Sequence, residues 1–476
     1  MSNTTLLIQP GSFDSPKHFY PKVLNASIHP MVQGFLNMSN DQIEERFCHL
    51  HPEVNRAKLK EVFNFKPKHL SWSGADLFCV VNEKGQRKMM LVELNSCPSG
   101  QKSMPWAEEF RETGGYLELL KRSFLPQLKR RTLPKGKLAV IYDKNYMETS
   151  GYAAALADLM QTPVYLVPFF NNAEQPLARF DQGVLQIRHQ ETWVPIRAAF
   201  RYVTQKPWNR IPPNTKTYIY NSTLSCLAGG RNKLMAAKAY DFLNAELKFD
   251  KLEIRTPETI WDVNLEQVPL WVERMGGIAV VKNPYSNAGQ GVYTITNKGE
   301  LDQFMAEEHS YKKFIVQALI GNSNWSSRSR EILYHVGTVP NKKLQIFAAD
   351  VRMMVGSGPG GFFPVSIYAR RAAKPLTNAL DPSVASWDML GTNLSSKNEN
   401  GQWITDPGRL YLMDRRDFNK LGIGLDDLIE AYIQTILSTI AIDRIADSLL
   451  TSKGVFRRRY FRTLNPDQNL VEEIMT

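Results

Sequence analysis

A lysine at the end of one predicted strand stands just before a loop of small polar residues. The strand ends in VVKNP (280–284), and the loop reads SNAGQGV (286–292) before a second strand begins. Small residues let backbone N–H groups approach an anion and the lysine adds a positive charge, a combination that suits a triphosphate. The loop lacks the GxxxxGK[ST] pattern and is flanked by strands, so it is not a Walker A loop. A plain Gly-rich hairpin with a solvated lysine is the alternative. The predicted nucleotide contacts here are Lys282, Ser286, Gly289, Gln290 and Gly291.

Oxygen ligands gather on a second predicted feature, the hairpin of residues 75–95. Asp76 lies in its first strand, and Glu93 and Asn95 close its second strand, beyond the turn sequence NEKG (82–85). Because side chains alternate along a strand, Glu93 and Asn95 share a face, and antiparallel pairing lets Asp76 converge on that face. Three oxygen donors without His or Cys suit Mg²⁺. A solvent-exposed polar face is the alternative, but the apolar neighbours predict a buried hairpin, where unpaired carboxylates would be costly.

The elements that must position these residues alternate strands and helices in the middle of the chain. KLAVIYD (137–143), a helix over 148–160 and PVYLVPF (163–169) predict a βαβ unit with a parallel sheet. Apolar residues at helical spacing predict helices before residue 70 and over 425–450. The predicted fold class is therefore α+β or α/β, with helical segments at both ends. Further strands are expected within 184–225, 278–295, 313–321, 344–355 and 361–373.

Length and charge bound the classes of function. The 476 residues carry 58 Lys and Arg against 47 Asp and Glu, a formal charge of +11, and 43% are hydrophobic. This is the composition of a globular protein of about two to four domains. Two dense basic runs, 120–131 and 456–462, come without a nucleic-acid-binding signature, so anionic small molecules are favoured over nucleic acid. No apolar stretch is long enough to span a membrane, and four scattered cysteines and a start without signal-peptide character predict a cytoplasmic protein.

The order of lysine, small-residue loop and a following strand end resembles the ATP-grasp enzymes. FIVQALIG (314–321) offers a strand that ends at Gln317, followed by a small residue and two aliphatic residues that could cover an adenine. DVRMMV (350–355), ARRAA (369–373) and GTNLS (391–395) resemble the arginine strand, the second arginine position and the polar loop of that family. The resemblance implies an ATP-grasp fold in which a nucleotide lies between two lobes and contacts Lys282 and Gln317.

The metal motif stands where a circularly permuted group of that family has it. Glu-x-Asn is missing downstream and occurs instead as Glu93-Leu94-Asn95, ahead of the lysine. This order resembles the permuted group of glutathionylspermidine synthase-like carboxylate–amine ligases. It implies Asp76, Glu93 and Asn95 as metal ligands and Lys233, in AGGRNK (228–233), as the first nucleotide lysine. The group has an arginine two residues before the metal aspartate, where this chain has Gly74. The catalytic arginine is therefore expected to be Arg352 or Arg371.

The resemblance implies an ATP-dependent carboxylate–amine ligase that forms an amide or peptide bond through an acyl-phosphate, with ATP and Mg²⁺ or Mn²⁺. Its substrates would be a small-molecule carboxylate and an amine, from among amino acids, peptides and polyamines, and assembly into a homo-oligomer is left open. Lys102 and Ser103, in the loop after the metal motif, are candidates to hold an acyl-phosphate or a substrate carboxylate, unless this is an ordinary exposed loop. Two other functions also stay open: a small-molecule kinase on the same fold, and a nucleotide-binding protein without catalysis.

The predicted domain organisation follows from these assignments. A metal-binding hairpin of the ATP-grasp core precedes an α/β domain and the nucleotide-binding lobes, and helical segments lie at both ends. The expected boundaries are 1–72 for the N-terminal helical segment, 73–105 for the hairpin, 106–225 for the pre-ATP-grasp α/β domain with the βαβ unit, 226–415 for the nucleotide-binding lobes and 416–476 for the C-terminal helical segment.

Overall fold

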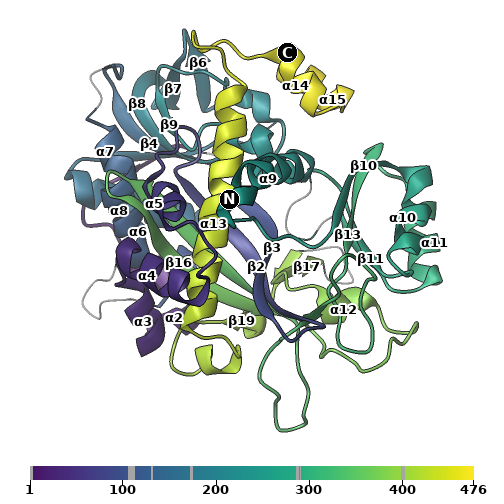
Figure 1. Ribbon diagram of the computed structural model, residues 1–476. Coiled ribbons are helices and arrows are strands. Elements are labelled where there is room, and N and C mark those ends of the chain that lie inside the picture. Colours follow the sequence, from purple (N-terminus) through teal and green to yellow (C-terminus); the bar gives the residue numbers. More distant parts are fainter. Residues whose placement is uncertain are drawn as a thin grey trace.

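The chain folds into three larger sheets and the helices that cover them (Figure 1). The computed structural model describes residues 4–105, 113–129, 132–171, 175–285, 289, 291–397 and 403–475. Parallel and antiparallel strands occur together with many helices, so the predicted mixed class is confirmed.

A six-stranded antiparallel sheet carries the predicted metal hairpin. Its order is β14-β2-β15-β16-β19, with β3 also paired to β2. Asp76 lies directly opposite Glu93 in the β2–β3 hairpin, which confirms that prediction. The long apolar helix α13 (Leu425–Ser448) packs across β2, β3 and β15 and fills the main core (Figure 1). The strands are β2 (Trp72–Asn82), β3 (Arg87–Ser96), β14 (Leu333–His335), β15 (Ala349–Gly358), β16 (Gly361–Arg371) and β19 (Leu410–Tyr411).

A seven-stranded sheet contains the predicted βαβ unit. Its order is β1-β5-β4-β8-β7-β6, with β9 beside β8. β4 runs parallel to both β5 and β8, and α8 (Tyr146–Met160) connects β4 to β5. The N-terminal segment, which was expected to be mainly helical, also supplies the short strand β1 at the edge of this sheet. The strands are β1 (Leu6–Ile8), β4 (Lys137–Tyr142), β5 (Val164–Pro168), β6 (Ala178–Asp181), β7 (Val184–His189), β8 (Thr192–Tyr202) and β9 (Tyr218–Tyr220).

A four-stranded antiparallel sheet of order β10-β13-β11-β12 lies beside the six-stranded sheet (Figure 1). β11 and β12 flank the small-residue loop, as predicted from the sequence. Helices α10 (Val268–Arg274) and α11 (Lys298–Ala306) supply apolar side chains to the core of this sheet. Its strands are β10 (Thr259–Asn264), β11 (Ala279–Lys282), β12 (Val292–Ile295) and β13 (Lys313–Ala318), and a separate pair is formed by β17 (Ser395–Lys397) and β18 (Trp403–Thr405).

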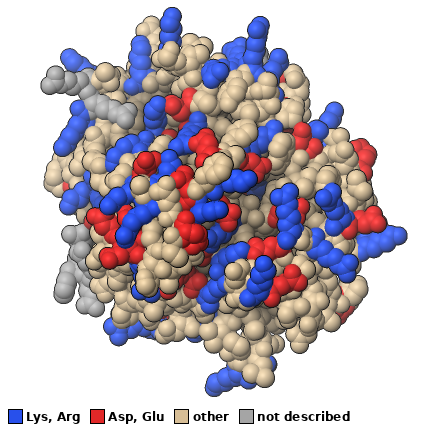
Figure 2. All heavy atoms as spheres, in the orientation of Figure 1, with Lys and Arg blue, Asp and Glu red and all other residues tan. Residues whose placement is uncertain are grey.

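The remaining helices are short, apart from α9, which packs against α13. Within the described ranges, no helix combines the length and apolarity that a membrane crossing requires. Lys and Arg side chains are interspersed with Asp and Glu over the face shown in Figure 2. The helices are α1 (Ser15–His18), α2 (Pro21–Leu24), α3 (Pro30–Leu36), α4 (Asn40–Leu50), α5 (Arg56–Asn64), α6 (Gly114–Leu119), α7 (Leu125–Gln127), α9 (Lys233–Leu247), α12 (Ser386–Leu390), α14 (Arg458–Leu464) and α15 (Gln468–Met475).

Candidate active site

Three pockets that share lining residues lie along the six-stranded sheet; two of them are also lined by the four-stranded sheet, and the third by the segment that follows β4. We call them the inner, outer and cationic pockets, and their volumes are about 120, 430 and 200 Å³. Glu93 lines all three pockets, whereas Lys233 and Lys282 line the inner and outer ones. Asp76 lines the inner and cationic pockets. The structure therefore brings together residues that lie far apart in the sequence.

Each pocket also has a wall of its own. The rest of the inner pocket is lined mainly by aliphatic and aromatic side chains, and the rest of the outer pocket mainly by polar and charged ones. The cationic pocket is lined by several lysine and arginine side chains. The inner pocket is defined by Val280, Ile320, Trp387 and Leu390, the outer pocket by Lys88, Asp241, Arg255 and Glu331, and the cationic pocket by Tyr20, Lys102, Lys144, Arg231 and Arg352.

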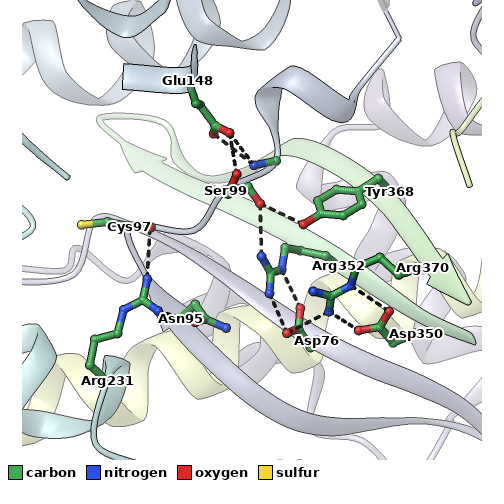
Figure 3. Close-up of polar contacts among 11 residues, drawn as sticks. Asp76, Asn95, Cys97, Ser99, Glu148, Arg231, Asp350, Arg352, Tyr368 and Arg370 are labelled. Carbon is green, nitrogen blue, oxygen red and sulfur yellow. Dashed lines mark hydrogen bonds and ion pairs between the residues drawn. The ribbon is translucent and has the colours of Figure 1, made fainter. Parts of the chain in front are cut away.

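Asp76 is held by two arginines, Arg352 from the neighbouring strand β15 and Arg370 from β16, the strand beyond it (Figure 3). Arg352 donates from Nε to Asp76 Oδ1 and from Nη2 to Oδ2, both at 2.6 Å. Arg370 Nη2 lies 3.0 Å from Oδ2 and also pairs with Asp350. Burial opposes ionisation of Asp76, but the charges of Arg352 and Arg370 prevail and hold its pKa at about 2. The Asp76 carboxylate is therefore ionised at neutral pH.

Arg370, not the predicted Arg371, faces the cleft from β16. The Arg371 guanidinium lies over the Phe347 ring, 4.4 Å from its centroid, and donates to the carbonyl of Ala372. Successive side chains of a strand point to opposite faces, so neighbouring arginines cannot both enter one cleft. The sequence ARRAA offers two arginines in succession, and only the pairing of β16 with β15 decides which one meets Asp76. Arg352, the other predicted arginine, does lie in the site.

Lys282, at the end of β11, is fixed by a polar chain across the four-stranded sheet. Its Nζ donates to Gln317 Oε1 at 2.6 Å, and Gln317 Nε2 donates to Thr259 Oγ1 at 2.7 Å. Burial lowers the pKa of Lys282 to about 8, although Glu93 and Asp76 act to raise it. Gln317 thus orients the lysine from the strand end where a nucleotide contact was predicted.

Glu93 and Asn95 are each approached by a cation from the segment before or at the start of α9. Lys233 Nζ lies 3.5 Å from Glu93 Oε1. Arg231 Nη1 donates to Asn95 Oδ1 at 2.8 Å, while Asn95 Nδ2 is buried and has no partner among the described residues. Arg231 was missed from the sequence, although it stands two residues before Lys233. Its role depends on the packing of this segment against β3, which no local pattern reveals.

Part of the small-residue loop is described, and it borders the inner pocket. Gly289 has φ 78°, and a Cβ there would lie 2.5 Å from Asn393 Nδ2, so the close approach of the polar loop 391–395 requires glycine. Gly291 has φ 60°. Ser286 and Gln290, which were also predicted to contact a nucleotide, lie outside the described residues.

His335, at the end of β14, is a second residue that the sequence did not single out. It lines the inner pocket and hydrogen-bonds the backbone of Ile320. Its Nδ1 is buried and has no partner within the described part of the chain. Burial lowers its pKa to about 4, so the imidazole is neutral at physiological pH. No motif marks this histidine, because only the pairing of β14 with β2 brings it to the cleft.

The fit of a divalent cation depends on the oxygen lone pairs that remain unused. A carboxylate offers about four acceptor positions, and the arginines take three of those of Asp76. Of the contacts known within the described ranges, Glu93 has the long ion pair to Lys233, and Asn95 Oδ1 receives one bond from Arg231. Mg²⁺ takes one or two carboxylates together with water and phosphate oxygens, so the unused positions suit it. Among the described residues, no cluster of three or more His, Cys, Asp or Glu forms a metal site by itself.

No protein-family model and no curated protein matches this chain. Solved structures similar to it include a glutathione synthetase-like effector from Globodera pallida, with 9% identity, 73% of this chain and 87% of that chain covered, and a TM-score of 0.39. A RimK domain ATP-grasp protein from Sphaerobacter thermophilus matches at 13% identity over 51% of this chain and 92% of its own, with a TM-score of 0.29. D-alanyl-alanine synthetase A from Vibrio cholerae matches at 11% identity over 55% and 93% of the two chains, also with a TM-score of 0.29. The solved structures to which this chain is similar thus include an ATP-grasp protein.

Proposed function

We propose that the protein is an ATP-dependent carboxylate–amine ligase that forms an amide or peptide bond through an acyl-phosphate. The observation that carries the proposal is the meeting of Glu93, which lines all three pockets, with Lys233 and Lys282, which line the inner and outer ones; we call this place the junction. Such a junction offers phosphates their positive charges and a divalent cation its oxygen ligand at one place. Asp76 lines both the inner and the cationic pocket, and the cations of the latter suit a carboxylate that accepts the phosphoryl group.

The nucleotide is assigned to the inner pocket and the junction. Val280, Ile320 and Leu390 can cover the faces of a base, and Lys233 and Lys282 can make charge-assisted hydrogen bonds to phosphates. Ligand sites usually have volumes of about 300–1,000 Å³. The inner pocket, with about 120 Å³, is smaller, so the nucleotide would extend into the adjoining part of the outer pocket.

Asp76, Glu93 and Asn95 would hold Mg²⁺ or Mn²⁺. When bound, the ion would supply positive charge that neutralises phosphate oxygens. Arg352 is held by Asp76 and by the carbonyl of Ser99, to which its Nη1 donates at 3.2 Å (Figure 3). A guanidinium fixed in this way can stabilise charge on the transferring phosphoryl group without reorienting during the reaction. Arg370 would act beside it.

The reaction would then proceed in two steps. A carboxylate oxygen of the first substrate takes the γ-phosphoryl group, and ADP leaves. An amine attacks the acyl carbon, phosphate leaves with the bonding electrons of the C–O bond, and the nitrogen loses a proton. Amino acids, peptides and polyamines are the proposed substrate classes. The four cysteines are free, which agrees with the proposed cytoplasmic location.

A screen of carboxylates and amines for ADP release, with mass spectrometry of the products, tests the proposal. An amide product with one ADP per bond is expected. Glu93→Gln should remove turnover, whereas Glu83→Gln, on the exposed hairpin turn, should retain it. ADP accompanied by a phosphorylated product and no amide would instead identify a kinase. Nucleotide binding without ADP release from any pair would favour a binding protein without catalysis.

A further inference from the structure

Two lysines of the cationic pocket, Lys102 and Lys144, have no part in the proposed phosphoryl transfer. Lys144 follows the carboxyl end of β4, which runs parallel to both β5 and β8. The chain leaves β4 toward β5 and leaves β8 toward β9, on opposite sides, so the connections diverge at this edge of the sheet. In open parallel sheets, ligands bind in the crevice at such a point. The position of Lys144 therefore marks a binding crevice independently of its charge.

Lys144 is half-buried and has no ion-pair partner in the described part of the chain. Its neighbour Asp143 forms no ion pair with it: Asp143 Oδ2 lies 3.1 Å from Arg210 Nη2 and accepts from the backbone N–H groups of Thr204 and Gln205 at 2.9 and 2.8 Å. Asp143 Oδ1 is buried without a partner among the described residues, and the charge of Asp143 partly offsets the cost of burying Lys144. Burial and the charge of Arg231 lower the pKa of Lys144 to about 7. Keeping a partly buried ammonium charged costs free energy unless an anion binds beside it.

Lys102 is held at the same pocket by a rigid loop. Glu148, buried in the first turn of α8, accepts from Ser99 Oγ at 2.7 Å and from the backbone N–H groups of Gly100 and Gln101 at 3.0 and 3.2 Å (Figure 3). The Lys102 carbonyl accepts from Tyr20 N–H, and its ammonium lies 5.0 Å from the centroid of the Tyr20 ring. The loop donors occupy the Glu148 oxygens, and Lys102, whose charge reaches Glu148 without an ion pair, lines the cationic pocket.

The charges of the cationic pocket are thus ion-paired at one end only. Arg352 and Arg370 pair with Asp76, whereas Lys102 and Lys144 form no ion pair within the described part of the chain. The carboxylates whose charges reach the two lysines, Glu148 and Asp143, accept their hydrogen bonds from other groups. A substrate carboxylate that reacts near Arg352 leaves these two lysines unmatched. Resting on the ligase function proposed above, we propose that the acyl substrate carries a second anionic group, a carboxylate or a phosphate, which Lys102 and Lys144 bind.

Matched pairs of small molecules test this inference by calorimetric titration in the presence of Mg²⁺. The pairs are L-glutamate against L-glutamine, and O-phospho-L-serine against L-serine. We expect the acidic member of at least one pair to bind at least about tenfold more tightly. This factor corresponds to the usual free energy of a charge-assisted hydrogen bond. Lys144→Met and Lys102→Met should each abolish most of this preference, and Lys144→Arg should retain it. Lys84→Met, the same change on the exposed turn, should have no effect.

The same samples are titrated with ATP to separate this inference from the proposed function. Normal ATP binding with equal affinities within both pairs would overturn the second anionic group and leave the ligase proposal standing. An acidic preference that survives in both methionine variants would overturn the assignment to these lysines. Loss of ATP binding in the wild type would instead contradict the ligase proposal, whatever the pocket binds. The pair that shows the preference identifies the anion as carboxylate or phosphate.

Discussion

Asp76 and Arg352 lie directly opposite each other on neighbouring antiparallel strands, joined by two hydrogen bonds of 2.6 Å. The Asp76 carboxylate is 11% exposed, and so is the Arg352 side chain, so the pair is largely shielded from water. Breaking a buried pair by removing one partner usually costs about 3–5 kcal/mol, because a charge remains uncompensated. The pair therefore stabilises the contact between strands β2 and β15, which both supply residues to the proposed site.

The first prediction concerns the acid stability that Asp76 confers. Its folded-state pKa of about 2 lies below the ordinary value of 3.8, so its contribution is complete above pH 4 and is lost as the pH falls through 2. The full contribution is about 2–3 kcal/mol, from about 1.4 kcal/mol per pKa unit. Asp76→Asn should lower the free energy of unfolding at pH 6, and the gap to the wild type should narrow as the pH falls toward 2. Urea unfolding at several pH values measures this, and a gap independent of pH would contradict the assigned pKa.

The local elements of the site could be predicted from the sequence because their signals are local. Alternating apolar residues around NEKG mark the β2–β3 hairpin, and the register of that hairpin places Asp76 opposite Glu93. The meeting of Lys282 with Glu93 was expected from the order of the motifs, and both residues line the inner pocket. The choice between the two arginines of β16 could not be predicted, because it depends on the pairing of distant strands. Arg370 enters the cleft instead of Arg371 because β16 pairs with β15 in one register only.

Other residues of the site carry no sequence signal at all. Lys144 is an ordinary residue after a strand, and only the strand order of the seven-stranded sheet makes its position special. His335 belongs to a three-residue strand whose pairing with β2 could not be inferred from its length or composition. The strand β1 was missed for the same reason, since three residues give no periodicity to detect.

The second prediction is that Lys282→Ala weakens ATP binding far more than it destabilises the protein. A charge-assisted hydrogen bond contributes about 1.5–3 kcal/mol, which corresponds to a loss of about ten- to two-hundredfold in affinity. Among the described residues, the hydrogen bond that the free protein loses is the one to Gln317, so its melting temperature should fall slightly. Calorimetric titration with ATP and Mg²⁺, paired with a thermal melt, distinguishes the two effects. An unchanged affinity with a large drop in melting temperature would identify Lys282 as structural.

The third prediction follows from the pKa of Lys282, which burial lowers to about 8. Only the protonated lysine attracts phosphate, so ATP affinity should decline as the pH rises above 8. The stability of the free protein should change in the opposite direction. Between pH 8 and 10.5 the unfolded chain binds more protons at this group than the folded chain, so the contribution of Lys282 rises with pH. Titrations of ATP at pH 7, 8 and 9 measure the first effect, and Lys282→Met should remove this dependence.

The fourth prediction compares neighbouring arginines of β16. Arg370→Lys keeps the charge but loses the planar fork that contacts both Asp350 and Asp76, and turnover should fall at least about tenfold. Arg371→Lys, on the opposite face, should retain turnover, because only its contacts with Phe347 and the Ala372 carbonyl change. A thermal melt of each variant shows whether it is folded. The reverse pattern would restore Arg371 as the catalytic arginine.

The last prediction is a preference for ATP over GTP that depends on His335. At neutral pH its imidazole is uncharged, since burial lowers its pKa to about 4. The bond to the Ile320 backbone leaves Nδ1 as an acceptor that is buried in the wall of the inner pocket and has no partner among the described residues, so a bound base would reach it by a shift of that wall. An acceptor there suits the exocyclic amino group of adenine and opposes the carbonyl oxygen that guanine has at the corresponding position. His335→Phe keeps the ring packed against Phe78 but removes the acceptor, so ATP affinity should fall and the preference over GTP should shrink by about two- to tenfold. Competition of ATP and GTP for the wild type and the variant measures this preference. If both proteins discriminate equally, the base is selected by other groups of the pocket.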